Sequence, residues 1–268
     1  MPRFAVDGAE LHHEVTGTGR PVLLVHGATG DAAGYWGSLA PVLATRSTVV
    51  TYDQRGFGRS TPAPSIEVPV LALDAAALLD HLGLGPAAVV GASLGGMVAQ
   101  QLAVDRPDLV ERLVLVGTGP RIGPRLRLMG EVLGRVTELG DPALLFDLNT
   151  VLATGELHLA AHAGEIAGAR RELEERGRAW FGRALATPPA WDGVELERVE
   201  VPTLVVAGDE DAEMPLRYAR ELAHRLPGAR LLVLEGAGHK CFLEQPDAFA
   251  RAVGAFLAGE WPERSVPG

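Results

Sequence analysis

A short apolar strand that runs directly into a G-x-S-x-G turn constrains this chain more than any other feature. The residues from Val89 to Gly96 read Val-Val-Gly-Ala-Ser-Leu-Gly-Gly, and a helix-compatible segment, Met97 to Ala103, follows at once. Because Gly91 and Gly95 lack a Cβ, a strand and a helix can meet closely around Ser93. Such a turn exposes the serine Oγ and directs the free N–H groups of the helix N-terminus toward its target. The segment therefore predicts a nucleophilic serine, with a plain junction of small residues as the alternative.

Length and composition favour one large α/β domain, or such a domain with an insertion. The chain has 268 residues, of which 47% are hydrophobic, so a sizeable core needs neither metal nor disulfide. Cys241 is the single cysteine, which excludes an intrachain disulfide and suits a reducing compartment. We find no signal peptide at the N-terminus, and no segment approaches the roughly 18 apolar residues of a membrane span. We therefore expect a cytoplasmic protein.

The charge of the chain limits its partners. A net charge of −10 argues against nucleic acid and against anionic membrane surfaces. We expect a small-molecule substrate as the partner, and a monomer or a homodimer as the assembly.

Apolar runs alternate with helical patterns in the first 118 residues and again after residue 199. The expected strands are Leu11–Val15, Pro21–Val25, Ser47–Tyr52, Ala87–Val90, Leu113–Val116, Thr203–Ala207 and Arg230–Leu234. The expected helices are Tyr35–Leu43, Val68–Leu82, Leu216–Leu226 and Pro246–Leu257. Strands that alternate with helices predict an α/β fold with a mostly parallel, twisted sheet and helices on both faces.

Residues 119–199 break this alternation, because they contain no convincing strand pattern. Three helical stretches are expected there: Leu126–Leu139, Pro142–Leu152 and Leu157–Leu185. We therefore predict that residues 1–118 and 200–268 form one core domain, and that residues 119–199 form a helical cap inserted into it.

A serine is a poor nucleophile unless a base takes its proton and a third group orients that base. The later sequence offers both groups at the ends of strands, where parallel strands place them at the same sheet edge as Ser93. His239, in the loop after the last strand, is the candidate base. The residues alone leave the acid open among the carboxylates that follow the strand at 203–207, which are Asp209, Glu210, Asp211 and Glu213.

Acyl transfer also requires two backbone N–H groups that bind the oxyanion. Leu94, directly after the serine, supplies one, and Ala28 in the loop His26–Gly30 supplies the other, with a plain glycine-rich turn as the alternative. The cap would cover a pocket for a medium-sized hydrophobic substrate. Candidate pocket residues, many of which would equally well pack a core, are Tyr35, Trp36, Met129, Leu133, Phe146, Trp180 and Phe181.

Five motifs occur in an order that resembles the α/β-hydrolase superfamily. They are His26-Gly27, Asp53-Gln54-Arg55-Gly56-Phe57-Gly58-Arg59-Ser60, Gly91–Gly96, Pro202–Asp211 and Gly238–Pro246. The resemblance implies the α/β-hydrolase fold, and it implies a structural role for the second motif. The acid of this family usually lies three residues after the glycine that ends its strand. That spacing selects Asp211 after Gly208, with Asp209 as the lesser candidate. Ala92 departs from the pattern, because many members carry histidine there.

The residue type of the nucleophile narrows the choice among branches of the superfamily. Haloalkane dehalogenases and epoxide hydrolases of this fold use aspartate at the turn, so Ser93 argues against them. Serine esterases, lactone and enol-lactone hydrolases, haloperoxidase-like perhydrolases and meta-cleavage C–C hydrolases remain. We expect hydrolysis of a carboxylic ester, lactone or thioester through an acyl-enzyme, with no metal or organic cofactor. Use of the same triad for C–C hydrolysis, elimination or perhydrolysis is one alternative, and a non-catalytic binding protein is another.

Overall fold

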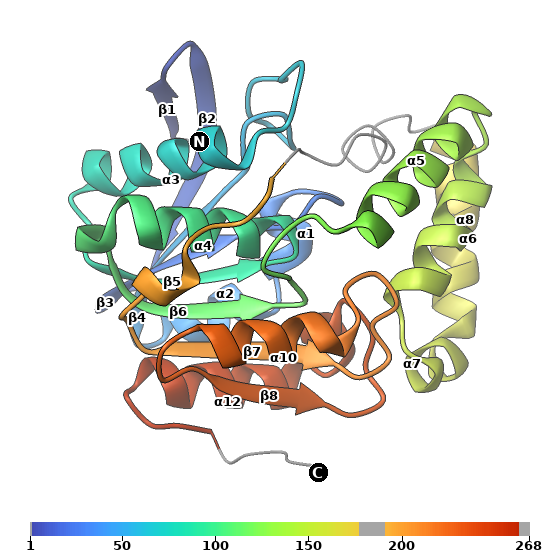
Figure 1. The fold of residues 1–268 in the computed structure, drawn as a ribbon. Coiled ribbons are helices and arrows are strands. Elements are labelled where there is room, and N and C mark those ends of the chain that lie inside the picture. Colours follow the sequence, from blue (N-terminus) through green and yellow to red (C-terminus); the bar gives the residue numbers. More distant parts are fainter. Residues whose placement is uncertain (1, 177–190, 263–268) are drawn as a thin grey trace.

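The computed structural model describes residues 2–176 and 191–262, and the strands of these residues form a single sheet (Figure 1). Its spatial order is β1-β2-β4-β3-β5-β6-β7-β8. β2 runs antiparallel to both of its neighbours, and every pair from β4 to β8 is parallel. The prediction of a mostly parallel sheet is therefore confirmed. The bounds are β1 Arg3–Val6, β2 Ala9–Thr16, β3 Arg20–Val25, β4 Ser47–Tyr52, β5 Ala87–Ala92, β6 Val110–Val116, β7 Thr203–Gly208 and β8 Arg230–Leu234.

Helices cover both faces of the sheet, as predicted. One hydrophobic cluster joins the sheet to α3 (Val68–Leu82), α4 (Leu94–Asp105) and α10 (Leu216–Arg225). A second cluster joins the opposite face to α2 (Leu39–Ala44) and α12 (Pro246–Leu257). The central strand β5 is buried along its whole length and contributes side chains to both clusters. This double burial explains why its sequence is continuously apolar rather than alternating.

Two local expectations differ from the structure. The single helix expected over Tyr35–Leu43 is two short helices, α1 (Ala32–Trp36) and α2. The Asp31 side chain accepts a hydrogen bond from the Gly34 N–H, so α1 begins earlier, and α1 ends at Gly37. Strand β1 was not predicted, because its four residues are too few to show a recognisable pattern. They form a strand because they pair with β2.

The described part of the stretch between β6 and β7 contains helices joined by turns, and no strand. It contains α5 (Pro124–Glu138), α6 (Pro142–Ala153), α7 (Glu156–Ala161), α8 (Ala163–Arg176) and the 3-10 turn η2 (Leu196–Arg198). The helix expected from Leu157 is interrupted at His162, and its last part lies outside the described residues. The four α-helices, called cap helices below, stand beside the carboxyl edge of the parallel strands (Figure 1).

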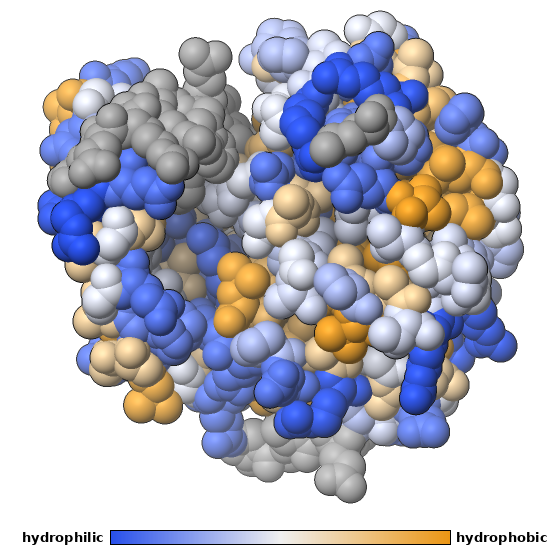
Figure 2. Space-filling model, turned by 180° about the vertical axis from the view of Figure 1, so that it is seen from behind, coloured by the Kyte–Doolittle hydropathy of each residue, from blue (hydrophilic) through white to orange (hydrophobic). Residues whose placement is uncertain are grey.

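Figure 2 shows hydrophilic residues spread over the rear face, with residues of intermediate hydropathy and small hydrophobic groups between them. The surface is hollowed on the side where the cap helices meet the rest of the molecule (Figure 2). No helix in the described part of the chain combines the length and the apolar character that a membrane crossing requires.

Candidate active site

The turn between β5 and α4 holds Ser93 in an unusual backbone conformation. Its φ of 54° and ψ of −117° lie in a region that residues with a Cβ rarely adopt. The Ser93 N–H donates to the carbonyl of Val116 at 2.9 Å, and the Thr118 hydroxyl donates to the Ser93 carbonyl at 2.8 Å. These two hydrogen bonds to the end of β6 therefore hold Ser93 in a strained conformation. Such strain costs about 1–3 kcal/mol, and strained residues are typical of functional positions.

The glycines of this turn are required by close packing. A Cβ on Gly91 would overlap the carbonyl oxygen of Gly95, and a Cβ on Gly95 would overlap the carbonyl oxygen of Val25 in β3. Helix α4 therefore approaches the sheet more closely than any residue with a side chain allows. The first N–H of α4, on Leu94, has no acceptor within the helix, which is the arrangement that an oxyanion donor needs.

The structure brings His239 and Asp211 together at the carboxyl edge of the sheet. The Nδ1 of His239 lies 2.8 Å from Oδ2 of Asp211, and both residues are buried. The other carboxylate oxygen of Asp211 accepts the Met214 N–H at 2.7 Å, which fixes its orientation. Two other carboxylates of this loop have different partners. Oδ1 of Asp209 accepts the Gly236 N–H at 2.7 Å, and Glu210 accepts the N–H of Glu156 in the cap helices.

Glu213, one of the four carboxylates among which the sequence left the acid open, contacts the other nitrogen of the same histidine, and the sequence did not predict that contact. Its Oε2 lies 3.4 Å from Nε2 of His239, and its Oε1 accepts a hydrogen bond of 3.1 Å from the amide of Asn149 on α6. Glu213 and Asn149 are both buried. Within the described residues, Nε2 faces this carboxylate and makes no hydrogen bond with Oγ of Ser93. The only local signal was a charged residue between apolar neighbours.

These carboxylates dominate the electrostatics of the histidine. Burial favours its neutral ring, but the charges of Asp211 and Glu213 outweigh burial and raise the pKa of His239 to about 9. Burial also raises the pKa of Glu213, while the neighbouring His239 opposes that rise. Lys240 faces the same group, and burial lowers the pKa of its ammonium. Burial raises the pKa of the Cys241 thiol strongly, which disfavours its thiolate form.

A hydrogen-bond network braces the loop that carries Ala28. The Nε2 of His26 accepts the Gln54 N–H at 3.0 Å, so Nδ1 carries the proton and donates to the carbonyl of Gly27 at 2.7 Å. The Gln54 side chain also donates to the His26 carbonyl at 2.7 Å. Burial lowers the pKa of His26, in keeping with a neutral ring that holds the loop.

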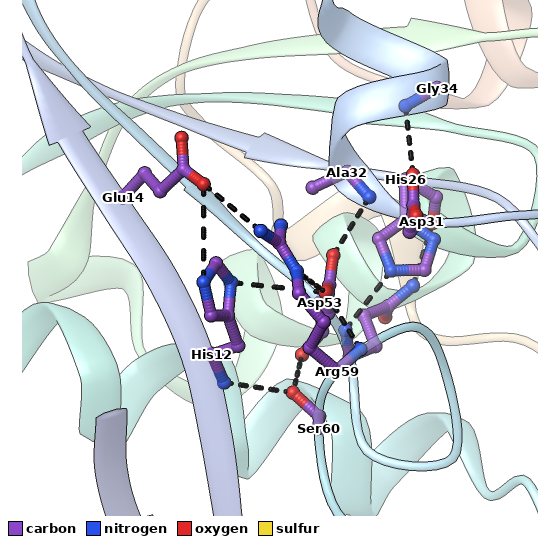
Figure 3. A network of polar contacts seen from close by, with 10 residues as sticks. His12, Glu14, His26, Asp31, Ala32, Gly34, Asp53, Arg59 and Ser60 are labelled. Carbon is purple, nitrogen blue, oxygen red and sulfur yellow. Dashed lines mark hydrogen bonds and ion pairs between the residues drawn. The ribbon is translucent and has the colours of Figure 1, made fainter. Parts of the chain in front are cut away.

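Figure 3 shows how the residues after β4 extend this network. Asp53 accepts the Ala32 N–H at 3.0 Å and both the backbone and side-chain N–H groups of Arg59, at 2.9 and 3.0 Å. The Ser60 hydroxyl donates to the Asp53 carbonyl and accepts the His12 N–H at 2.9 Å. These contacts are structural, as the resemblance implied for this motif.

The candidate pocket residues occupy different environments. Met129 and Leu133 line a cavity of about 270 Å³ between α5 and α6, and Phe146 is half-buried on α6. Trp36 differs from expectation, because it is fully buried in the core beside Phe242, with ring centroids 5.2 Å apart. Trp36 therefore packs the core and does not line a pocket.

Tyr35 lies nearer to the site than Trp36. Its ring stacks on Phe242 at 5.4 Å, while its hydroxyl lies 3.0 Å from the Thr29 hydroxyl and against Gly27 of the braced loop. The two remaining pocket candidates, Trp180 and Phe181, lie outside the described residues. No cluster of three or more His, Cys, Asp or Glu within residues 2–176 and 191–262 is arranged to hold a metal ion.

The cap helices are attached to the two loops that carry Asp211 and His239. The Arg125 guanidinium donates to the Ala212 carbonyl at 2.9 Å, next to Asp211. Glu244 accepts the N–H groups of Gly155 and Gly238, each at 3.0 Å, and so joins α7 to the histidine loop. A movement of the cap helices would therefore shift the loops that hold Asp211 and His239.

Comparison with known proteins places the chain among hydrolases. A model of the alpha/beta hydrolase family matches residues 22–252. A relative from Caulobacter sp. (strain K31), named "Putative carbamate hydrolase RutD", is 32% identical over 273 residues, which cover 97% of this chain and 99% of the relative.

Two solved structures give the same result. The thermophilic esterase from Thermogutta terrifontis is 29% identical with a TM-score of 0.81, and the match covers 97% of this chain and 99% of that one. The enol-lactonase from Burkholderia xenovorans LB400 is 28% identical with a TM-score of 0.81, covering 96% and 100%. The predicted fold class is therefore confirmed over nearly the whole chain.

Proposed function

The chain belongs to the alpha/beta hydrolase family, and on that premise we propose that it cleaves a carboxylic ester, lactone or thioester through an acyl-enzyme on Ser93. One observation carries this proposal most directly. The 2.8 Å hydrogen bond between His239 and Asp211 lies at the sheet edge where Ser93 is held in its strained turn. The similarity to an esterase and an enol-lactonase supports the same reaction class.

The proposed reaction begins with proton transfer. The Nε2 of His239 takes the proton of the Ser93 hydroxyl while Oγ bonds to the acyl carbon, and the carbonyl oxygen becomes an oxyanion. The N–H groups of Ala28 and Leu94 stabilise that oxyanion. Asp211 keeps the proton on Nδ1, so that Nε2 is the basic nitrogen, and it stabilises the imidazolium that forms.

In the second half of the reaction, His239 first gives its proton away and then takes one from water. The Nε2 of His239 donates its proton to the leaving alcohol or thiol as the bond to the acyl carbon breaks. Water then loses a proton to Nε2 and attacks the acyl-enzyme, and Ser93 regains its proton when the acid leaves. In each step Nε2 must exchange its contact with Glu213 for a contact with Ser93, the leaving group or water.

Removal of the proposed second oxyanion donor tests the role of Ala28. We expect Ala28→Pro to lower kcat by about 10²–10³-fold, because proline has no N–H to donate. Steady-state rates with a p-nitrophenyl ester measure the effect, and circular dichroism checks that the variant is folded. A folded variant with unchanged kcat would remove Ala28 from the mechanism.

The pKa of His239 predicts a pH profile displaced toward alkaline values. Only the neutral imidazole can accept the Ser93 proton, and Asp211 and Glu213 favour the charged ring. The kcat/KM for a neutral ester should therefore rise about tenfold per pH unit and level off only near the pKa of about 9. A profile that is already flat near neutral pH would show that the free enzyme holds its histidine neutral.

A panel of neutral substrates tests the reaction class. We expect turnover of at least one p-nitrophenyl ester, lactone or thioester, with a burst of nitrophenol and an acyl mass trapped on Ser93 after acid quenching. An alkyl carbamate belongs in the panel because of the name of the Caulobacter relative. Turnover of a diketone or a peroxide-dependent reaction, with no hydrolysis of any acyl substrate, would contradict the proposal.

A further inference from the structure

The carboxylate of Glu213 occupies the side of His239 on which the chemistry takes place. Nδ1 of the ring is engaged by Asp211, so Nε2 is the nitrogen that exchanges protons with Ser93 and with the leaving group. The Oε2 of Glu213 lies 3.4 Å from this nitrogen. A leaving atom must come within about 2.6–3.2 Å of Nε2 to receive a proton, so the atoms next to it in the substrate lie beside Glu213.

The position of Glu213 is fixed from two sides. Its backbone belongs to the loop after β7, directly beyond Asp211, while the amide of Asn149 on α6 donates to Oε1 at 3.1 Å. Glu213 is 6% exposed and Asn149 is 2% exposed, so water does not screen the charge. The arrangement therefore presents Oε2 toward Nε2 and leaves Oε1 engaged by the cap helices.

Catalysis removes the counter-charge of this buried carboxylate. In the structure the ring of His239 is the partner of Oε2, but the ring must be neutral before it can act as a base. Because burial raises the pKa of Glu213, its ionised form is destabilised when the ring becomes neutral, and only another cationic partner would keep that form. Lys240 also faces Glu213, although within the described residues its ammonium forms no ion pair with that carboxylate at 4 Å or less. Tyr35, from α1, faces the same carboxylate through its hydroxyl and brings no positive charge.

A positively charged hydrogen-bond donor on the leaving group would resolve this conflict. Such a group pairs with Oε2 of Glu213 and compensates the carboxylate when His239 loses its proton. We propose that Glu213, held by Asn149, is the leaving-group specificity residue of this site and selects acyl substrates whose leaving alcohol carries a protonated amine. This inference rests on the proposed serine hydrolase function and names its substrate class.

The net reaction of such a substrate is balanced without any further reactant. The ester of an amino alcohol and one water give a carboxylic acid and the free amino alcohol. The C–O bond of the ester breaks, the alkoxide oxygen takes the proton from Nε2 of His239, and the ammonium keeps its own proton throughout.

Two esters of the same shape test this selectivity. 2-(Dimethylamino)ethyl butyrate carries a protonated amine near neutral pH, and 3-methylbutyl butyrate replaces that amine by a neutral carbon. We expect the protein to prefer the amino ester by about 30-fold in kcat/KM, which is the contribution expected of one hydrogen bond between charged groups. Glu213→Gln should reduce this preference to below about threefold.

The same variant gives a second readout that a purely structural role would not produce. With one carboxylate fewer facing His239, the acid limb of the kcat/KM profile for 3-methylbutyl butyrate should move to lower pH, since Asp211 alone then opposes burial and Lys240. Glu210→Gln is the matched control. Glu210 lies in the same loop and binds the Glu156 N–H, away from the ring, so this variant should keep both the preference and the profile.

The outcomes separate this inference from the function on which it rests. An equal preference in the parent and in Glu213→Gln would overturn the inference. Hydrolysis of neither ester by a protein whose Ser93 still reacts with a fluorophosphonate would also overturn it, while the serine hydrolase function stands. A folded protein that neither hydrolyses the esters nor reacts with the fluorophosphonate would overturn both.

Discussion

Replacement of Ser93 by alanine is expected to lower kcat by about 10⁶-fold. The activity that remains would come from substrate binding and from stabilisation of the oxyanion alone. The variant keeps the N–H donated to Val116 and the carbonyl that accepts the Thr118 hydroxyl, so the turn should persist. It loses only the oxygen that bonds to the acyl carbon. Initial rates with a p-nitrophenyl ester, at matched protein concentration and with thermal unfolding as the check on folding, measure this effect.

The control for Ser93→Ala is Ser38→Ala. Ser38 is exposed at the start of α2, and its side chain makes no capping hydrogen bond, so its loss should leave kcat unchanged. More than a tenth of the parent activity in a pure Ser93→Ala preparation would place the nucleophile elsewhere in the chain.

Replacement of Asp211 by asparagine is the second large effect, a loss of about 10⁴-fold in kcat. The amide oxygen can still accept the Met214 N–H, which leaves the amide nitrogen facing Nδ1 of His239. Nδ1 must then accept a hydrogen bond, so Nε2 carries the proton and cannot take the proton of Ser93. Single-turnover rates of acylation measure the loss at the step where the tautomer matters.

Asp209→Asn is the matched control for Asp211→Asn. Asp209 was the lesser candidate for the acid, and in the structure it accepts the Gly236 N–H at the surface. We expect Asp209→Asn to retain kcat within a few-fold. The reverse pattern, a large loss at Asp209 and a small one at Asp211, would exchange their roles.

The core of the fold was predictable because its signals are local. The β5 strand, the glycines around Ser93 and the helix after it are continuous in sequence, and the close packing of α4 on the sheet requires the two glycines, Gly91 and Gly95. Helix α3 was predicted with both ends correct, and Gly83 closes it with a left-handed φ of 63°. Strands β4 and β8 were also predicted with their exact bounds.

The parts that sequence reasoning missed depend on contacts between distant residues. β1 exists because it pairs with β2, and the contact of Glu213 with His239 exists because two strand ends meet at one sheet edge. Asn149 reaches Glu213 from a cap helix whose position no local pattern specifies. The spacing of a known family selected Asp211 among the loop carboxylates, and only the folded loop showed that another of them faces the histidine.

The most direct test of an activated serine is the rate at which the protein acquires a single fluorophosphonate adduct, followed by intact mass. We predict one adduct on the parent, none on Ser93→Ala, and a rate reduced by at least about 10³-fold in His239→Ala, because Ser93 then loses its proposed base. Equal labelling of the parent and Ser93→Ala, or no labelling of a folded parent protein, would contradict the account.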